Sequence, residues 1–196
     1  MTKGQRKDVI LNGVIVGNYE STGDDKKDIE ISRDILKKKG LWKKQEVVDM
    51  MFSQAQSFGY TANHLYEKDI KRHPRKFYSF APFVVNAAFS IEIYLKTLHK
   101  LYGKDIKGHS LAELYEGLDK KAKSTIKHIA EETRNLYQIE KDKDFEYYLS
   151  SLDTAFVKWR YIYESDVGKI YFLPTIYVMQ VLDKTCVEVK KIQKKT

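Results

Sequence analysis

The stretch that most limits the fold of this chain runs from Ser79 to Tyr102 and reads SFAPFVVNAAFSIEIYLKTLHKLY. Its apolar residues recur at steps of four and three, which is the spacing of one helix face. The residues of that face are Phe80, Val84, Ala88, Ile91, Leu95, Leu98 and Tyr102, with Val85, Phe89, Ile93 and Tyr94 on other faces. A helix that is apolar nearly all round belongs in the middle of a bundle. The sequence therefore predicts a central buried helix, with Ser79 as its cap and Pro82 in its first turn.

Two charged residues interrupt this apolar stretch. Glu92 and Lys96 are four residues apart, so they share a helix face. A charge that faces a packed interior must be paired or must serve a site, because an isolated buried charge is strongly unfavourable. Glu92 and Lys96 are therefore candidate site residues. Their alternative role is a helical ion pair that contributes about 0.3–0.5 kcal/mol.

Composition limits the class of protein further. The only cysteine, Cys186, excludes an intramolecular disulfide and favours a reducing, cytoplasmic location. No apolar stretch reaches eighteen residues and the N-terminus lacks the apolar run of a signal peptide, so we expect no membrane association. The segment GKDIKGHS lacks the spacing of a phosphate-binding loop, and the five histidines show no zinc-binding spacing. We therefore predict no metal and no cofactor.

The chain is basic, with 35 Lys and Arg residues against 27 Asp and Glu residues and a formal charge of +8. Such a charge favours polyanionic partners. The densest basic cluster inside the domain is KRHPRK, residues 71–76, which breaks a helical pattern at Pro74. We take its four cationic side chains as candidate RNA-binding residues. They are Lys71, Arg72, Arg75 and Lys76. The alternative is a solvated loop between two helices.

Residues 1–41 are predicted to form a small N-terminal region. β-Branched residues flank Asn12-Gly13 within residues 8–20, which predicts a β-hairpin. A short helix is expected from about Asp28 to a stop at Gly40. Its apolar face consists of Ile31, Ile35 and Leu36.

Residues 42–196 are predicted to form a bundle of about five main helices, so the fold class is all-α with a small β-hairpin. Besides the central helix, helical spacing extends over residues 42–70, 119–138, 145–164 and from about 174 onwards. Ser110 and Glu113 have capping-box spacing and predict a short additional helix, and Asp142 or Asp144 is the expected cap of the 145–164 helix. The expected inward-facing residues include Ala122, Ile126, Ile129, Leu136, Trp159, Val178, Leu182, Cys186, Val189 and Ile192.

Three segments together resemble a known family. They are NAAFSIEIYLKTL, GHSLAELYEGL and FVKWRYIYE, in that order along the chain. This order is similar to the HEPN superfamily of helical-bundle proteins from prokaryotic toxin–antitoxin, abortive-infection and nucleotidyltransferase-associated systems. The resemblance covers roughly residues 45–190. It implies a homodimer of four- or five-helix bundles and, in active members, metal-independent RNA cleavage at the dimer cleft.

The sequence departs from the nuclease motif of that family, which is an Arg followed by four to six residues and a His. Arg160 is followed by YIYESDV and Arg134 by NLYQIEKD, and none of the six arginines has a His at that distance. A variant site is a candidate instead, formed by Arg160, His109, Glu92 and Lys96. The structural alternatives are a salt bridge from Arg160 to Glu164 or Glu92, and a hydrogen bond from His109 at the Ser110 cap.

The sequence thus predicts a HEPN-like homodimer in bacterial defence, either abortive infection against phage or a toxin–antitoxin system. It favours binding of RNA or of a protein partner, such as an antitoxin or a phage protein, over cleavage. The alternatives are an RNase toxin with a non-standard site and a nucleotide-binding accessory subunit.

Overall fold

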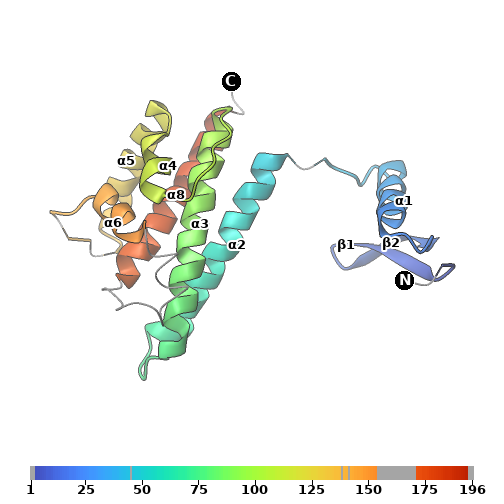
Figure 1. The fold of residues 1–196 in the computed structure, drawn as a ribbon, viewed down its shortest axis with the longest axis horizontal. Helices are drawn as coiled ribbons and strands as arrows, with labels where there is room; N and C mark the ends of the chain where they lie inside the picture. Colours follow the sequence, from blue (N-terminus) through green and yellow to red (C-terminus); the bar gives the residue numbers. More distant parts are fainter. Residues whose placement is uncertain (1–2, 45, 138, 141, 154–170, 194–196) are drawn as a thin grey trace. The chain divides into compact units, whose positions relative to one another are not determined.

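The computed structural model describes residues 3–44, 46–137, 139–140, 142–153 and 171–193. These residues form seven α-helices and one two-stranded antiparallel sheet, which confirms a predominantly helical fold with an N-terminal hairpin. The chain divides into two compact units (Figure 1), which we name unit 1 (Met1–Gln45) and unit 2 (Glu46–Thr196). The boundary lies four residues after the one placed by the sequence, between residues 41 and 42.

Unit 1 begins with the predicted hairpin. Strand β1 (Arg6–Leu11) pairs antiparallel with β2 (Val14–Glu20). Asn12 and Gly13 connect them with φ angles of 51° and 80°. A two-residue turn of this kind needs positive φ at both positions, which Asn-Gly adopts readily. The Asn-Gly pair therefore fixes the hairpin locally, as predicted.

Helix α1 (Asp25–Lys38) packs against this hairpin. It begins three residues before the expected Asp28, because the Asp24 carboxylate accepts hydrogen bonds from the backbone N–H groups of Lys26 and Lys27 and so caps an earlier turn. A Cβ at Gly17 would lie 2.6 Å from the Ile35 Cγ2 atom, so a glycine in β2 is what allows α1 to approach this closely.

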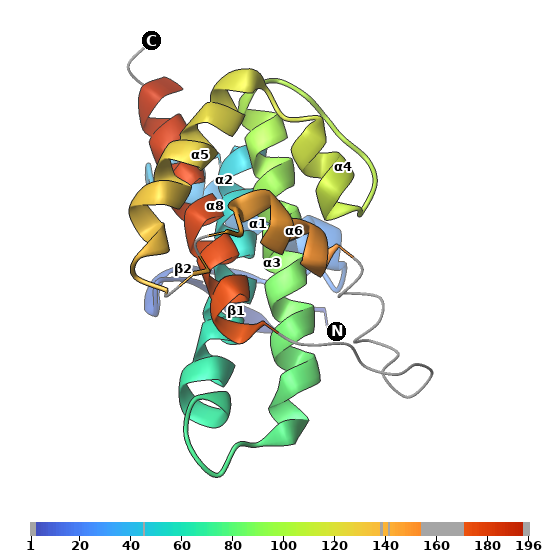
Figure 2. The same cartoon turned by 90° about the vertical axis from the view of Figure 1, so that its left-hand side faces the viewer.

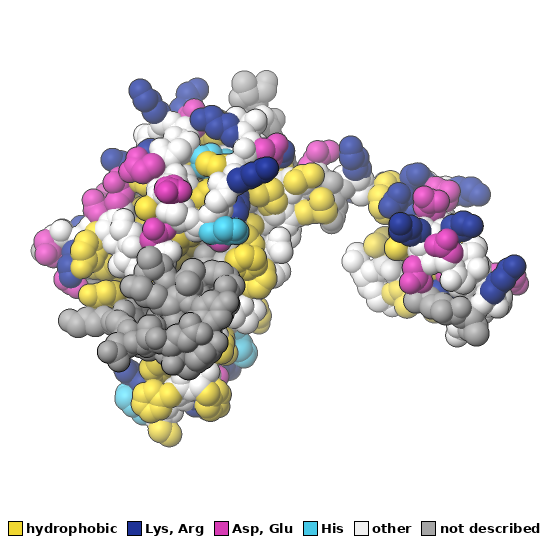
Figure 3. All heavy atoms as spheres, viewed as in Figure 1, with side chains coloured by type: hydrophobic (Ala, Val, Ile, Leu, Met, Phe, Trp, Pro, Cys, Tyr) yellow, Lys and Arg dark blue, Asp and Glu magenta, His cyan; other side chains and the backbone are white. Residues whose placement is uncertain are grey.

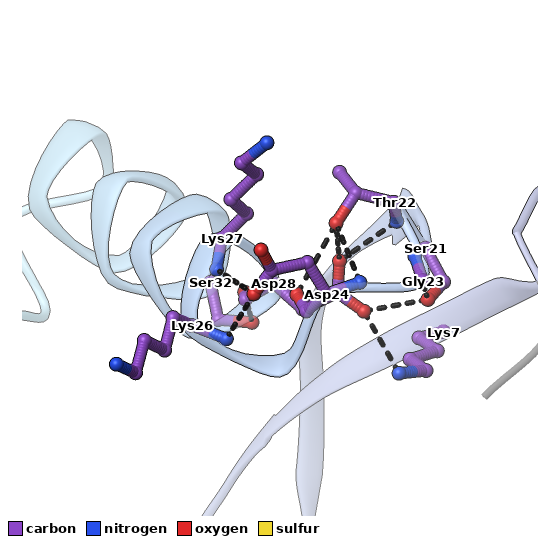
Figure 4. A network of polar contacts seen from close by, with 9 residues as sticks. All are labelled: Lys7, Ser21, Thr22, Gly23, Asp24, Lys26, Lys27, Asp28 and Ser32. Atoms are coloured by element: carbon purple, nitrogen blue, oxygen red, sulfur yellow. Dashed lines mark hydrogen bonds and ion pairs between the residues drawn. The ribbon is translucent and has the colours of Figure 1, made fainter.

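A buried carboxylate joins α1 to the hairpin (Figure 4). Asp28 accepts hydrogen bonds from Lys7 Nζ at 2.8 Å, Ser21 Oγ at 2.6 Å, Thr22 N at 2.8 Å and Thr22 Oγ1 at 2.7 Å. The hydrogen bond from Lys7, followed by that from Ser21, holds the pKa of Asp28 well below its usual range. Because β1, the loop after β2 and α1 all contribute to this network, it links the three parts of unit 1.

Unit 2 is a helical bundle. Its elements are α2 (Val47–Leu65), the π-helical turn η1 (Tyr66–Ile70), the 3₁₀ turn η2 (Phe77–Ser79), α3 (Phe80–Leu101), α4 (Leu111–Glu116), α5 (Lys120–Arg134), α6 (Phe145–Leu152) and α8 (Phe172–Gln193). Helices α3 and α8 lie in the middle, with α2 on one side and α4, α5 and α6 on the other (Figures 1 and 2). The packing confirms α3 as the central helix.

The core of unit 2 is built around α3. Phe83, Ile91, Leu95 and Leu98 are fully buried there. The segment Phe77–Leu101 is long and apolar enough to cross a membrane by length and composition alone, and 61% of its most apolar window is buried inside the unit. A buried core helix of a globular protein shows the same combination of length and composition.

Several sequence expectations about helix ends need correction. The long helix expected from Trp42 to Ile70 begins only at Val47 and ends at Leu65, where the π-turn follows. Ser79 makes no cap bond with its side chain, because its Oγ donates to Asp69 Oδ2 at 2.8 Å.

Two expected core residues are exposed for the same physical reason. Leu136 is 72% exposed because α5 ends at Arg134, and Ile192 is 52% exposed in the last turn of α8. The predicted caps Ser110 and Asp144 are confirmed, through Glu113 N and Tyr147 N respectively. The helix expected over residues 145–164 is described as far as Leu152, and Trp159 lies outside the described residues.

Candidate functional site

Three of the four candidate catalytic residues meet at one carboxylate oxygen. Glu92 lies on α3 with its side chain 6% exposed. Its Oε1 atom accepts a hydrogen bond from Lys96 Nζ at 2.7 Å, one helical turn further on, and lies 3.0 Å from His109 Nδ1. The expectation that Glu92 must be paired is thus met by two partners, one from α3 and one from the segment before α4.

The connection between α3 and α4 positions His109. Gly108, directly before it, has a φ of +108°, a conformation that favours glycine. Ser110, directly after it, caps α4 by accepting a hydrogen bond from Glu113 N at 3.2 Å. Fixed backbone on both sides thus holds the imidazole near Glu92. Its hydrogen bond goes to Glu92 and not to the Ser110 cap.

The direction of the hydrogen bond between His109 and Glu92 follows from the carboxylate partner. An ionised carboxylate can only accept, so Nδ1 of His109 carries the proton and donates to Glu92. The other ring nitrogen, Nε2, has no hydrogen-bond partner among the described residues, and the side chain is 79% exposed. A buried carboxylate therefore orients an imidazole whose second nitrogen is accessible from solvent.

Asp153, which follows α6, supports the same corner of the bundle. Its Oδ2 accepts a hydrogen bond from Ser110 Oγ at 3.2 Å and its Oδ1 accepts one from Ala112 N at 3.1 Å. These bonds tie the start of α4 to the end of α6. Sequence reasoning missed Asp153, because 43 residues separate it from Ser110 and no local pattern marks the pairing.

The charges of this cluster suit proton transfer beside a negatively charged substrate. Lys96, which is 21% exposed, already neutralises Glu92, so His109 is not needed to compensate the buried charge. A carboxylate-oriented imidazole is a common general base, and a neighbouring ammonium group stabilises negative charge that develops on a substrate. The fourth candidate, Arg160, lies outside the described residues.

The structure divides the candidate RNA-binding residues into two pairs. Lys71 forms an ion pair with Glu67 at 3.1 Å and Lys76 with Asp69 at 2.7 Å. The Lys76 ammonium lowers the pKa of Asp69, to which the hydrogen bond from Ser79 adds. Arg72 and Arg75 are exposed and have no acidic partner in the described part of the chain. The unneutralised charge of this loop thus comes from the two arginines.

The remaining reactive groups have structural surroundings. Cys186 is fully buried in α8, and burial raises the pKa of its thiol well above the usual range, as expected for a core cysteine. Among the residues that the structure describes, no group of three or more His, Cys, Asp or Glu side chains is arranged to hold a metal ion.

Fold and site together define a predominantly helical protein of two units, with a glutamate–lysine–histidine cluster where the central helix meets the segment before α4. Comparisons with family models, with curated proteins and with solved structures gave no match to this chain. The geometry of the cluster and the HEPN-like segments of the sequence are therefore the features that bear on function.

Proposed function

We propose that this protein is a HEPN-like, cytoplasmic homodimer of a bacterial defence or toxin–antitoxin system, and that unit 2 cleaves RNA without a metal, with His109 as its general base. The observation that carries the proposal is the exposed imidazole of His109, which buried Glu92 holds at 3.0 Å through Nδ1. The predominantly helical fold and the three HEPN-like segments support the family assignment.

The chemistry follows from these positions. Nε2 of His109 takes the proton of a ribose 2′-hydroxyl, and the 2′-oxygen bonds to the adjacent phosphorus. The bond from phosphorus to the 5′-oxygen breaks, and that oxygen takes a proton from solvent. Glu92 stabilises the imidazolium that forms, while Lys96 lies beside it to stabilise charge on the phosphate. The products are a 2′,3′-cyclic phosphate and a 5′-hydroxyl.

The rival function is binding of RNA or of a protein partner without cleavage, which the sequence favours because the Arg-to-His nuclease motif is missing. One contact agrees with this rival function. The Lys96 ammonium forms an ion pair with Glu92 at 2.7 Å, which leaves it less available to stabilise charge on a phosphate during cleavage. The two functions differ in a measurable way, because only cleavage uses the 2′-hydroxyl as the attacking group and leaves a 2′,3′-cyclic phosphate.

The test is incubation of the full chain with end-labelled single-stranded RNA in excess EDTA. We expect fragments that carry 2′,3′-cyclic phosphate and 5′-hydroxyl ends, and we expect single-stranded DNA of the same sequence to stay intact. RNA that is bound but not cut under these conditions would show that the catalytic proposal is wrong and that the binding function is the better one.

The proposed dimer gives a separate prediction. The HEPN resemblance implies two copies around one cleft, so light scattering at micromolar protein should give a mass near twice 23.0 kDa. Such a dimer contains two copies of His109, one from each protomer. A mass of 23.0 kDa across the concentration range would remove the dimer and any cleft that depends on it.

A further inference from the structure

Two large aromatic side chains are exposed next to each other at one end of unit 2. Phe77 is 76% exposed and Tyr78 is 73% exposed, in the turn that connects the basic loop to α3. Figure 3 shows apolar side chains beside basic and histidine side chains at this lower end of the unit. Adjacent exposed aromatics with nearby cations are typical of a contact surface rather than of a solvated loop.

This turn is held in place from both sides. Asp69 of η1 accepts hydrogen bonds from Lys76 Nζ at 2.7 Å and from Ser79 Oγ at 2.8 Å, directly before and after the two aromatics. The Phe77 ring packs edge-on against Phe80 with centroids 5.2 Å apart. The aromatic pair is therefore presented on a fixed turn, which lowers the entropy lost when a ligand binds.

The charge around the aromatics is positive. Within the described residues, Lys71 and Lys76 are neutralised by Glu67 and Asp69, whereas Arg72 and Arg75 have no acidic partner. A planar guanidinium group binds phosphate with two hydrogen bonds and also stacks on bases. The two arginines thus supply phosphate contacts within a few residues of the rings.

We propose that this surface, which we name the tip (Arg72, Arg75, Phe77 and Tyr78), binds single-stranded RNA. Unpaired bases stack on Phe77 and Tyr78, and the two arginines contact the neighbouring phosphates. The inference rests on the proposed function and deepens it, because it identifies the substrate of unit 2 as RNA with unpaired bases. A membrane surface fits less well: two rings on a short turn offer little apolar area compared with the face of an interfacial helix.

The tip and the cluster at Glu92 lie along one continuous helical stretch, formed by η2 and α3. Tyr78 of η2 and Glu92 of α3 are 14 residues apart (92 − 78), which at about 1.5 Å per helical residue is about 21 Å along η2 and α3. Stacked bases advance about 3.4 Å per nucleotide, so about six nucleotides cover this length. A probe of about 12 nucleotides is therefore long enough to reach the tip and the cluster together.

The test measures binding with a probe that cannot be cleaved, a fluorescent 2′-O-methyl oligonucleotide of about 12 nucleotides, added to the full chain. The double variant Phe77→Leu/Tyr78→Leu keeps apolar bulk but removes both aromatic faces. We expect about 5- to 150-fold weaker binding for each base that loses its stacking partner. Tyr60→Leu is the matched control, because Tyr60 is 74% exposed on α2, and its binding should equal that of the native chain.

The arginines are tested through salt dependence. Arg72→Ala/Arg75→Ala should make the slope of log K against log salt shallower by about 1.4, since each phosphate contact to a single strand contributes about 0.7. The control Lys120→Ala/Lys121→Ala removes the same charge from two exposed lysines at the start of α5 and should leave the slope unchanged.

Three results would overturn the tip proposal. The first is an affinity of Phe77→Leu/Tyr78→Leu for the probe that equals that of the native chain. The second is equal affinity of the native chain for a duplex of the same length. The third is sedimentation of the native chain with anionic vesicles that persists in Phe77→Leu/Tyr78→Leu, together with unaltered affinity of that variant for the probe. Because the probe has no 2′-hydroxyl, these results do not depend on catalysis by His109. A chain that binds the probe but cuts no RNA would leave the tip in place and reject the proposed cleavage.

Discussion

Replacing His109 with alanine is expected to lower the rate of RNA cleavage by about 10²–10⁴-fold, the usual contribution of a positioned general base. The fold should survive, because the side chain is 79% exposed and Glu92 keeps its ion pair with Lys96. Cleavage rate and thermal unfolding should therefore be measured on the same samples. We expect an unchanged melting temperature beside the lost activity.

The chain offers a matched control for this change. His128 on α5 is also exposed, at 74%, and lies 3.3 Å from the carboxylate of Glu132. His128→Ala removes a similarly exposed histidine, paired with an exposed rather than a buried glutamate, and should leave cleavage intact. Glu92→Gln, which keeps the shape but not the charge that stabilises the imidazolium, should lower the cleavage rate with binding of the uncleavable probe retained. Equal rates for His109→Ala and His128→Ala would remove His109 from the reaction.

The second large effect is expected in unit 1, where Asp28→Ala should unfold the hairpin and α1 together. The change leaves Lys7, Ser21 and Thr22 without the carboxylate that joins β1 and the following loop to α1. A unit of 45 residues has a small core and little stability to lose. Hydrogen exchange should show amide protection lost throughout β1 and β2 and retained in α3 and α8.

Two further measurements make this prediction specific. Asp34→Ala removes an exposed carboxylate that pairs with Lys37 on the surface of α1, and it should leave the hairpin protected. Because folding lowers the pKa of Asp28, its stabilisation is present above the unfolded pKa of about 3.9 and is lost as the pH falls below it. Hairpin protection should therefore decrease in acid. Protection in Asp28→Ala equal to that in the native chain would show that unit 1 does not depend on this carboxylate.

Local sequence patterns predicted those parts of the fold that local interactions determine. The Asn12-Gly13 turn, the caps Ser110 and Asp144 and the periodicity of α3 each involve residues within a few positions of one another. Helical spacing cannot say where a helix stops, so Leu136 was expected inside although α5 ends two residues earlier. The Ser79 hydroxyl could cap α3 or bond to Asp69, ten residues earlier in the chain. Its bond goes to Asp69, and the local sequence pattern around α3 does not encode that choice.

The candidate site was visible in part for the same reason. The four-residue spacing of Glu92 and Lys96 places both on one helix face, and the ion pair at 2.7 Å follows. His109 joins them over 17 residues, and in the sequence only its place directly before the Ser110 cap and the HEPN resemblance marked it. The bonds of Asp28 to Lys7 and of Asp153 to Ser110 span 21 and 43 residues, so no periodicity encodes them.

The π-helical turn at the end of α2 makes chain length, and not only residue type, a constraint on this protein. In η1 the N–H of Lys71 bonds to the carbonyl of Tyr66, five residues back, so the turn holds one residue more than an α-helical turn. Each helical residue rotates the chain by about 100°, so deleting Lys68 would turn Asp69 away from Lys76 and Ser79. Substitutions at exposed positions of η1 should leave the hydrogen bonds that hold the tip in place. A single-residue deletion should break them, although the sequences of the helices on either side are unchanged.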